Sequence, residues 1–317
     1  MISVIMATYN GADFLLPQLE SIRKQTVVPD EVVFLDDVSS DSTISIIENY
    51  IDMYQLKNWF VFRNTSNVGH YYNFIYGLKN VHGDLVFFAD QDDIWDIHKI
   101  EIMSQIMESN PNITCLKSIY KTIDDSIIAT ESSDNYSKKI IYPRFVEQMT
   151  DSGLGCQMCF RKSIIDFVLK NEIIRYESFD YHDLLLSYIS SAIGKNAIVE
   201  DYLLFHRYHE NNATRKSTYK YCSDTRIKRI NLIQVQSGRM IALLDIMDKY
   251  NIHNEELHKS VQAILKNNSI RIKFLQGHIL MVFILFKNRK YYKEFKTFLG
   301  DVLCGLGINA LICYFRK

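Results

Sequence analysis

Leu85-Val86-Phe87-Phe88-Ala89-Asp90-Gln91-Asp92-Asp93-Ile94-Trp95 is the stretch of this sequence that decides the fold. It begins as an apolar run with the length of a buried strand and ends in three carboxylates. Like charges this close repel one another, and each loses solvation on leaving water. A divalent cation would compensate them, and carboxylates spaced as Asp90-x-Asp92 suit Mg²⁺ or Mn²⁺. The alternative is a solvated acidic loop in which Asp93 or Asp96 caps the following helix.

The chain before this stretch alternates short apolar runs with segments of helical periodicity. The runs have the composition of buried strands and cover residues 3–7, 31–35, 59–62 and 84–89. Helical patterns separate them at residues 13–25, around residues 44–51, and at residues 70–81. This alternation with short turns predicts an α/β fold, in which helices cover both faces of a mostly parallel sheet.

Polar residues follow each of these predicted strands. In such sheets a binding site lies beyond the carboxyl ends of the strands, so these residues should meet at one edge. They are Thr8-Tyr9-Asn10, Asp36-Asp37, Arg63-Asn64 and Asp90-Gln91-Asp92. Four strands that all end in such groups favour a ligand site with a metal over a plain acidic loop.

A dinucleotide of the Rossmann type is not expected at this edge. No G-x-G-x-x-G follows the first predicted strand, and no Walker A loop occurs in the sequence. A nucleotide base could still bind near Tyr9 and Asp37. A carboxylate accepts the ring N–H of uracil or thymine, and a tyrosine ring stacks on the face of the base.

The following segment, to about residue 209, carries two further polar clusters. Strand-like runs at residues 114–123 and 156–160 precede a helix opened by His182-Asp183, and two short strands are predicted at residues 197–199 and 203–205. An acid in a first helical turn often only caps the helix, but His182-Asp183 near a metal edge is also a suitable proton acceptor. The stretch from His206 to His209 either holds a phosphate or closes over a ligand, or it is an ordinary solvated loop.

Charge is distributed unevenly along the 317 residues. Residues 1–219 hold 19 Lys+Arg against 30 Asp+Glu, whereas residues 220–317 hold 17 against 7. The resulting net charges of −11 and +10 predict a basic tail that contacts an anionic surface. RNA is the weaker choice of surface, because the acidic body would repel a phosphate backbone, so we expect no nucleic-acid partner.

The basic tail is expected to be helical. Apolar residues recur at helical spacing, with one stripe formed by Ile230, Ile233, Ile241, Leu244 and Met247. Residues 287–296 interleave five cations with aromatic rings, which fits a helix lying on an anionic bilayer. The same pattern also fits an ordinary helical subdomain with a solvated basic face, or a surface that pairs two copies of the chain.

Other features of the sequence narrow the class of protein. The longest wholly apolar run, residues 279–286, is too short to span a bilayer. The amino terminus lacks a basic segment before its apolar run, so no signal peptide is predicted and a cytoplasmic location is expected. Six scattered cysteines fit reduced thiols, and Cys156 and Cys159 are expected to be buried rather than to bind zinc.

Six motifs in this order resemble those of the family 2 glycosyltransferases, especially bacterial polysaccharide enzymes that include rhamnosyltransferases. The resemblance covers roughly residues 1–215, and one motif departs from it, because Val38 stands where the family has a small residue. The motifs are Ser3-Val4-Ile5-Met6-Ala7-Thr8-Tyr9-Asn10, Asp36-Asp37-Val38-Ser39-Ser40-Asp41, Asn67-Val68-Gly69 with Asn73, Asp90-Gln91-Asp92-Asp93-Ile94-Trp95, His182-Asp183, and His206-Arg207-Tyr208-His209-Glu210-Asn211-Asn212.

This resemblance implies a GT-A fold over residues 1–215, followed by a helical region at residues 216–317. It implies transfer of a sugar, with inversion, from a UDP- or dTDP-sugar (dTDP-rhamnose, a UDP-hexose or a UDP-N-acetylhexosamine). The implied acceptor is a hydroxyl of a growing lipid-linked surface polysaccharide, such as a capsule, at the inner face of the plasma membrane.

The resemblance also implies roles for individual residues. Asp183 would be the catalytic base, and Asp90 and Asp92 would bind Mn²⁺ or Mg²⁺. The donor-binding residues would be Ala7, Thr8, Tyr9, Asn10, Asp37, Asn67, Gly69, Asn73, Asp90, Gln91, His182, Arg207 and His209.

Two rival functions remain to be weighed. Asp90-x-Asp92 after an apolar strand also resembles phosphatases with an aspartate nucleophile, but that class expects the pair on its first strand and Thr or Val in place of Ile94. A membrane-docked interaction subunit without activity is the other rival. Intact carboxylates in both acidic motifs argue against it.

Overall fold

The computed structural model describes residues 1–124, 126–127, 133, 135–150, 153–209 and 226–308. The chain divides into two compact units, of which the first comprises Met1–Pro143 and Gly153–Glu210 and the second comprises Arg144–Ser152 and Asn211–Lys317. The predicted boundary between residues 215 and 216 lies outside the described residues.

Within the described residues, the first unit is built on a nine-stranded sheet in the order β3-β2-β1-β4-β8-β6-β9-β5, with β7 paired to β9. The strands are β1 (Ile2–Thr8), β2 (Glu31–Asp36), β3 (Trp59–Arg63), β4 (Leu85–Asp90), β5 (Ile94–Trp95), β6 (Ile113–Asp124), β7 (Ile140–Ile141), β8 (Met158–Arg161) and β9 (Lys195–Tyr208).

The predicted α/β class is confirmed, and the sheet is mostly parallel. Strands β1 to β4 form a parallel block, and β6 runs parallel to β9. Strand β8 is antiparallel to both β4 and β6, which the sequence did not predict. The prediction of two short strands at residues 197–199 and 203–205 is wrong, because one long strand, β9, covers both and follows β6 through irregular register.

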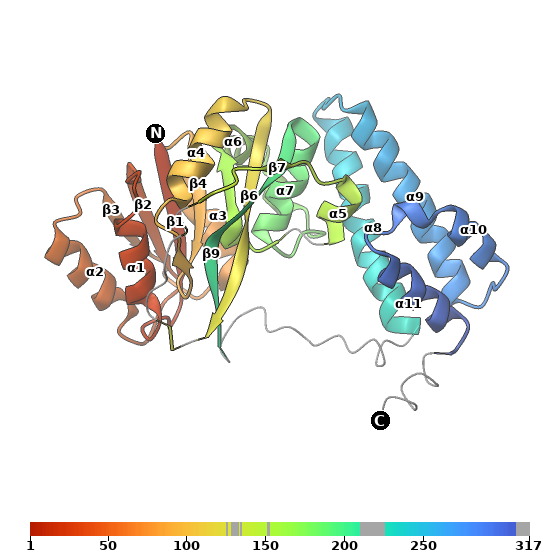
Figure 1. Ribbon diagram of the computed structural model, residues 1–317, viewed down its shortest axis with the longest axis horizontal. Helices are drawn as coiled ribbons and strands as arrows, with labels where there is room; N and C mark the ends of the chain where they lie inside the picture. The colour runs from red at the N-terminus through yellow and green to blue at the C-terminus, as the bar shows by residue number, and fades with distance from the viewer. Residues whose placement is uncertain (125, 128–132, 134, 151–152, 210–225, 309–317) are drawn as a thin grey trace. The chain divides into compact units, whose positions relative to one another are not determined.

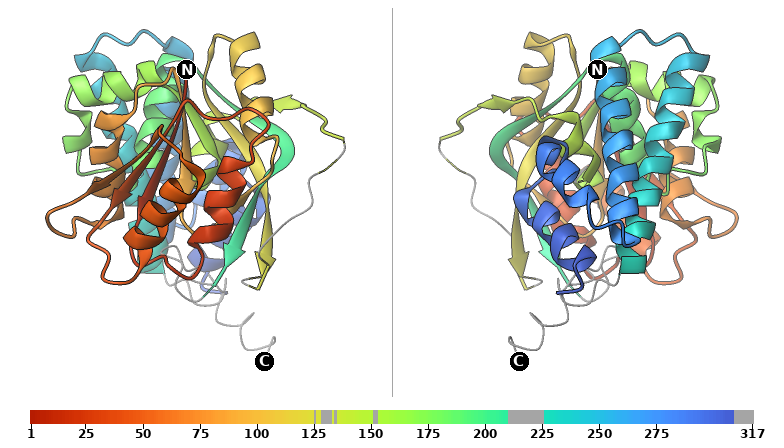
Figure 2. Two further views of the ribbon diagram at one scale, coloured as in Figure 1. Left: turned by 90° about the vertical axis from the view of Figure 1, so that its left-hand side faces the viewer. Right: turned by 90° about the vertical axis from the view of Figure 1, so that its right-hand side faces the viewer.

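Helices cover both faces of the sheet (Figures 1 and 2). Met6 packs in one core cluster with Leu19 and Met103, from two helices on the same face. Ile5 and Leu35 point the other way, so close to Gly77 that a Cβ there would lie 2.4 Å from a Leu35 methyl carbon. The helices of this unit are α1 (Leu15–Arg23), α2 (Thr43–Tyr54), α3 (Gly69–Gly77), α4 (Lys99–Ser109), α6 (Lys162–Lys170) and α7 (His182–Ile193), with 3₁₀ turns η1 (Leu78–Asn80), η2 (Gly155–Gln157) and η3 (Ile173–Arg175).

Because apolar side chains are buried on both faces of the sheet, the register of the strands is fixed. Burying a large apolar side chain stabilises by about 1.5–3 kcal/mol. A slip of one residue would exchange the two faces of a strand, and with them every such contact. The polar residues that follow the strands are therefore held in fixed positions at the carboxyl edge.

The second unit is helical in its described residues. It contains α5 (Phe145–Thr150), α8 (Arg226–Lys249), α9 (Glu255–Leu275), α10 (Met281–Lys287), η4 (Arg289–Tyr291) and α11 (Phe295–Gly305). Helices α8 and α9 are the two long helices, coloured cyan and blue, in the right-hand view of Figure 2. The predicted stripe is partly wrong: Ile241 is 59% exposed, and Met240, Leu243 and Ile246 are buried instead. Among the helices of this part of the chain, none combines the length and apolar composition that crossing a membrane requires.

A buried ionic cluster joins the helices of the second unit. Asp301 on α11 is fully buried and accepts from Arg229 Nη1 on α8 at 2.8 Å and from Arg271 Nε on α9 at 2.6 Å. The Tyr292 hydroxyl donates to the same carboxylate at 3.1 Å. Because a buried charge is tolerated only when it is paired, this carboxylate holds three segments in one arrangement.

Candidate active site

The register of the parallel strands brings the predicted polar edge together. Thr8 lies beside Asp36 on the neighbouring strand, and Ala7 lies beside Asp90 on the other side. Asp36 in turn lies beside Arg63. The carboxyl ends of β1, β2, β3 and β4 therefore meet at one edge, as the sequence predicted.

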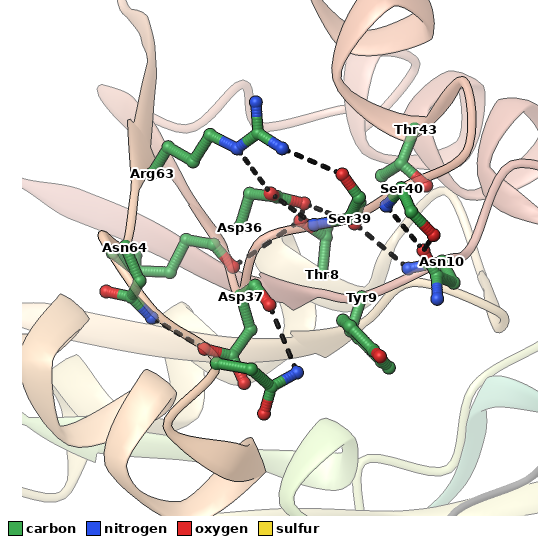
Figure 3. Close-up of polar contacts among 12 residues, drawn as sticks. Thr8, Tyr9, Asn10, Asp36, Asp37, Ser39, Ser40, Thr43, Arg63 and Asn64 are labelled. Carbon is green, nitrogen blue, oxygen red and sulfur yellow. Dashed lines mark hydrogen bonds and ion pairs between the residues drawn. The ribbon is translucent and has the colours of Figure 1, made fainter.

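Asp36 organises the framework of this edge (Figure 3). Its buried carboxylate accepts from the Ser39 backbone N–H at 2.9 Å and from the Thr8 hydroxyl at 3.2 Å. Arg63 Nε lies 3.4 Å from the same carboxylate, and an Arg63 N–H donates to the Ser39 carbonyl at 2.8 Å. Thr8 is only 1% exposed, so it supports the loop after β2 rather than presenting a group at the surface.

Asp37 accepts hydrogen bonds from the backbone at the start of helix α3. Its carboxylate accepts the backbone N–H groups of Val68 and Gly69, each at 2.8 Å, and an Asn64 side-chain N–H at 2.9 Å. A carboxylate has about four acceptor positions, so roughly one is left for a ligand. The Asn67 amide donates to the Asp37 carbonyl at 3.2 Å and belongs to the same turn.

The buried Asn73 side chain links α3 to its neighbours through hydrogen bonds. It is 1% exposed, its amide donates to the Leu35 carbonyl at 2.8 Å, and its carbonyl accepts from Asn64 at 2.9 Å. Together with the Asp37 contacts, it fixes α3 against the end of β2. Of the predicted donor-binding residues on this helix, Gly69 remains open, since a Cβ there would meet nothing within 4 Å.

Tyr9 is presented at the edge by a clasp with Gln91. The Tyr9 backbone N–H donates to Gln91 Oε1 at 2.9 Å, and Gln91 Nε2 donates to the Tyr9 carbonyl at 3.0 Å. The Tyr9 side chain is 50% exposed and extends away from the Asp36 framework (Figure 3). Asn10 follows with a positive φ of 46°, and its Oδ1 accepts from the Ser40 backbone N–H at 2.8 Å.

We expect Gly11→Ala to destabilise the protein by roughly 1–3 kcal/mol, as loss of two hydrogen bonds of 0.5–1.5 kcal/mol each would do. A Cβ on Gly11 would lie 2.2 Å from Gln91 Oε1, so Gln91 must leave Tyr9. Urea unfolding measures the loss. The matched control is Gly238→Ala in α8, where a Cβ would meet nothing within 4 Å and should stabilise the helix by up to about 1 kcal/mol. Equal stability of the two variants would contradict the clasp.

The acidic stretch after β4 is paired with residues from the end of β9. His209 Nε2 lies 2.9 Å from Asp92 Oδ2, and the His209 ring stacks on Phe14 at 4.1 Å between centroids. His206 Nδ1 lies 2.8 Å from Asp93 Oδ1. These contacts bring together two of the sequence motifs, which are more than one hundred residues apart.

The buried Arg207 side chain contacts the backbone of this acidic stretch. It is 1% exposed, and its guanidinium donates to the Asp92 carbonyl at 2.9 Å and to the Ile127 carbonyl at 2.7 Å. It therefore positions the acidic stretch through backbone contacts. A diphosphate contact, which the sequence resemblance implied, would compete with these bonds.

The acidic cluster accumulates negative charge where water is largely excluded. Burial, together with Asp93 and Asp92, raises the pKa of Asp90 to about 7. Burial and Asp93 also raise the pKa of Asp92. Burial and neighbouring carboxylates oppose the ionisation of these groups, and a bound cation would favour it. Their oxygens are a donor set that fits Mn²⁺ or Mg²⁺. The residues present therefore fit the predicted metal.

A buried lysine supplies part of the missing positive charge. Lys99 is fully buried, its ammonium donates to the Cys156 carbonyl at 2.5 Å, and it lies 4.0 Å from the centre of the Trp95 ring. Burial lowers its pKa to about 8, against the opposing effect of Asp93 and Asp90. Asp93, Cys156 and His206 also place ligand atoms within 4.8 Å of one another. Cys156 and Cys159 are buried free thiols, as predicted.

Asp183 lies at the start of α7 and next to η2. Its carboxylate accepts from the Leu184 backbone N–H at 2.7 Å, and a Cβ on Gly155 would lie 3.4 Å from Asp183 Cβ. Burial raises the pKa of Asp183 to about 6. Because Cys156 follows Gly155 and contributes to the group with Asp93, the 3₁₀ turn η2 touches both Asp183 and the acidic cluster.

His182 occupies an aromatic pocket beside Asp183. Its ring stacks on Phe74 at 3.9 Å and lies 5.5 Å from Phe88 and 5.9 Å from His70. Both ring nitrogens are buried without a hydrogen-bond partner among the described residues. Burial lowers the pKa of His182 well below its usual value, so the ring is neutral. It supports α7 and can donate one N–H toward a ligand.

Sequence reasoning missed three residues of this site: Lys99, Phe14 and His206 as a partner of Asp93. A signal existed for His206, because it lies in the same motif as Arg207 and His209. Lys99 and Phe14 gave none, since one looks like an ordinary helix-start lysine and the other like a core residue of α1. The last three residues of the final motif, Glu210-Asn211-Asn212, lie outside the described residues.

Known proteins resemble the chain in both sequence and structure. The family model described as Glycosyl transferase family 2 matches residues 3–168. Escherichia coli UDP-Glc:alpha-D-GlcNAc-diphosphoundecaprenol beta-1,3-glucosyltransferase WfgD is 28% identical over 163 residues, which are 49% of this chain and 58% of that protein. Shigella flexneri dTDP-rhamnosyl transferase RfbG is 26% identical over 222 residues, covering 65% of this chain and 72% of that one.

The fold has solved counterparts. The crystal structure of Staphylococcus aureus TarS 1-349 in complex with UDP-GlcNAc superposes with a TM-score of 0.59 at 19% identity, covering 84% of this chain and 72% of that chain. The chain spans between 43% and 66% of the length of three of the curated relatives it matches. At this identity the structural likeness establishes the fold.

Proposed function

The chain belongs to glycosyl transferase family 2, and on that premise we propose that it transfers a sugar, with inversion, from a UDP- or dTDP-sugar to a hydroxyl of a lipid-linked surface polysaccharide. The observation that carries the proposal is that two groups of carboxylates meet at the turn η2. This one turn touches both Asp183, a carboxylate with a raised pKa, and the carboxylates that follow β4. A proton acceptor and a site for a departing diphosphate are the two parts that a single displacement needs.

The donor base would lie against Tyr9. Half of that side chain is exposed, and the clasp with Gln91 holds its backbone in place. Asp37 keeps roughly one acceptor position, enough for one ring N–H of uracil or thymine. Both bases share that N–H, so the same geometry serves UDP- and dTDP-sugars. Asn10, Asn67 and Gly69 would line the same part of the donor site, with Ala7, Thr8 and Asn73 as its framework.

The diphosphate would face the end of β4. Asp90 and Asp92 would hold Mn²⁺ or Mg²⁺, which when bound neutralises the charge that develops on the leaving diphosphate. His209 keeps one Asp92 oxygen in place at 2.9 Å, and Arg207 fixes the Asp92 backbone. Lys99 limits the repulsion among the carboxylates from within the core.

The acceptor hydroxyl would lose its proton to Asp183. A single displacement requires the base to lie on the face opposite the leaving group. The raised pKa of Asp183, about 6, keeps the carboxylate ionised near neutrality while making it a stronger base than a solvated aspartate. The anomeric centre acquires oxocarbenium character, which nearby carboxylates stabilise.

The names of relatives support the choice of substrates. WfgD is named for a UDP-Glc donor and a diphosphoundecaprenol-linked acceptor, and RfbG for dTDP-rhamnosyl transfer. A lipid-linked acceptor would place the protein at the cytoplasmic face of the plasma membrane. There the second unit would contact either lipid or a second copy of the chain.

A donor-hydrolysis assay tests the proposed function. The protein is incubated with Mn²⁺ and a panel of UDP- and dTDP-sugars, and released nucleoside diphosphate is measured. We expect one donor, or a few related donors, to be cleaved at a slow rate set by water as acceptor. Release of inorganic phosphate from a simple phosphate ester would favour a phosphatase, and cleavage of no donor would favour an inactive interaction subunit.

A further inference from the structure

The second unit exposes a group of large apolar side chains around α10. Leu280 is 77% exposed, Phe283 67% and Phe295 68%. We define the apolar patch as these residues and their exposed neighbours: Ile279, Leu280, Phe283, Ile284, Phe286, Phe295 and Leu299. A group of exposed apolar side chains of this size on a folded unit marks an interaction site.

The residues of the apolar patch lie near one another on α10 and at the start of α11. Leu280, Phe283 and Ile284 have the three- and four-residue spacing that places side chains on one face of a helix. Phe286 from α10 and Phe295 from α11 both contact Phe298, at 4.9 Å and 5.7 Å between ring centroids. The end of α10 and the start of α11 therefore meet over a shared buried ring.

Helix α10 is anchored to its unit by Leu285, and the partly buried Met281 and Val282 pack against the same cluster. Leu285 is fully buried in a cluster with Phe274, Tyr292 and Phe298. The rest of the seven-residue helix, with sequence MVFILFK, is apolar almost all round. A helix that is apolar on every side needs a second apolar environment besides the core that anchors it.

Basic residues border the apolar patch. Lys287, Arg289, Lys290 and Lys296 are exposed, and Lys293 is partly buried. Glu294 is the one acid among residues 279–299. Positive charge beside inserted apolar side chains matches an anionic bilayer surface, where each Lys or Arg contributes roughly fivefold to binding. Two copies meeting through this patch would bring these like charges together, which disfavours a dimer there.

We propose that the apolar patch inserts into the headgroup region of an anionic lipid bilayer, with α10 lying along the surface and the basic residues contacting lipid phosphates. This inference deepens the proposed function, because a lipid-linked acceptor is reached from that surface. Its evidence is separate, since it lies wholly within the second unit.

Vesicle flotation of the full-length protein tests the inference. Binding is measured to vesicles of phosphatidylcholine with phosphatidylglycerol and to vesicles of phosphatidylcholine alone. The test variant is Leu280→Ser with Phe283→Ser. The matched control is Ile227→Ser with Ile241→Ser on α8, whose side chains are 70% and 59% exposed outside the patch. Thermal unfolding verifies that both variants are folded.

We expect the wild type to float with the anionic vesicles and to bind the neutral ones at least tenfold more weakly. The test variant should lose at least tenfold in affinity for anionic vesicles, and the control should bind as the wild type does. Equal binding by both variants, no binding by the wild type, or a solution dimer that only the test variant disrupts would each overturn the inference. Donor hydrolysis needs no membrane, so the proposed function stands or falls separately.

Discussion

Asp183→Asn is expected to reduce the rate of sugar transfer by about a thousandfold while leaving donor affinity nearly unchanged. The substitution keeps the shape of the side chain and removes its ability to accept a proton, and general-base catalysis contributes roughly 10²–10⁴-fold. The amide oxygen can still accept the Leu184 backbone N–H that the carboxylate accepts at 2.7 Å, so α7 should begin as before. Transfer kinetics give the rate, and calorimetry with UDP gives the affinity.

The pH dependence of transfer gives a second readout of this residue. A base works only when ionised, and burial raises the pKa of Asp183 to about 6. The rate should therefore rise as pH increases through about 6, whereas a solvated aspartate would be half ionised near pH 4 and would give a rise there. If the rate of Asp183→Asn still rises as pH increases through about 6, that rise reports the ionisation of another group.

Asp180 offers a matched control for Asp183. It is an exposed carboxylate three residues earlier on the segment that leads into α7. Asp180→Asn removes the same charge near the same helix and should change the rate by less than about threefold, as expected for a surface substitution. If both variants lose activity equally, the base assignment is wrong. If Asp183→Asn loses UDP binding, Asp183 belongs to the donor site instead.

Asp92→Asn should also cause a large loss of activity, but unlike Asp183→Asn it should weaken donor binding as well. It removes one of the two carboxylates proposed to hold the cation, so both donor binding and turnover should fall. Stabilisation of leaving-group charge is worth several kcal/mol, and we expect a loss of about a thousandfold in kcat/KM. The decisive measurement is calorimetry of UDP with and without Mn²⁺. The wild type should gain affinity from Mn²⁺, and the variant should not.

Asp13→Asn is the control for that variant. Asp13 is exposed just before α1 and directly precedes Phe14, on whose ring His209 stacks. Its substitution removes a carboxylate close to the site and should leave the Mn²⁺ effect intact. A full Mn²⁺ effect in Asp92→Asn would show that the carboxylate of Asp92 serves only to orient His209.

The sequence predicted the parallel half of the fold well because that half is local. Each strand from β1 to β4 is an apolar run followed by a helix with its own period, and the chain order of these units implies parallel pairing. The same logic predicted that Thr8, Asp36 and Asp90 would meet at one edge, and the strand register confirms it.

The rest of the fold depends on pairings between distant segments. Nothing in the composition of β8 shows that it inserts antiparallel between β4 and β6. The irregular register along β9 likewise breaks the apolar alternation, so one strand looked like two. Ile241 was assigned to the buried stripe of α8 from spacing alone, although the packing of the helix leaves it exposed.

The sequence predicted which residue types make up the candidate site. It did not predict which groups their side chains contact. Asp37 and Asn73 were expected to contact the donor, but their side chains mostly satisfy backbone groups at the start of α3 and the end of β2. The pairing of Asp92 with His209 needs two motifs to meet in space, and spacing along the chain carries no such information.

Donor hydrolysis in the presence of a chelator tests the central claim most directly. The claim is that the edge formed by Asp90 and Asp92 binds a cation on which departure of the diphosphate depends. With the donor that the hydrolysis panel identifies, we expect turnover to fall to background in chelator and to return when Mn²⁺ or Mg²⁺ is added in excess. Full turnover that persists in chelator would contradict the account.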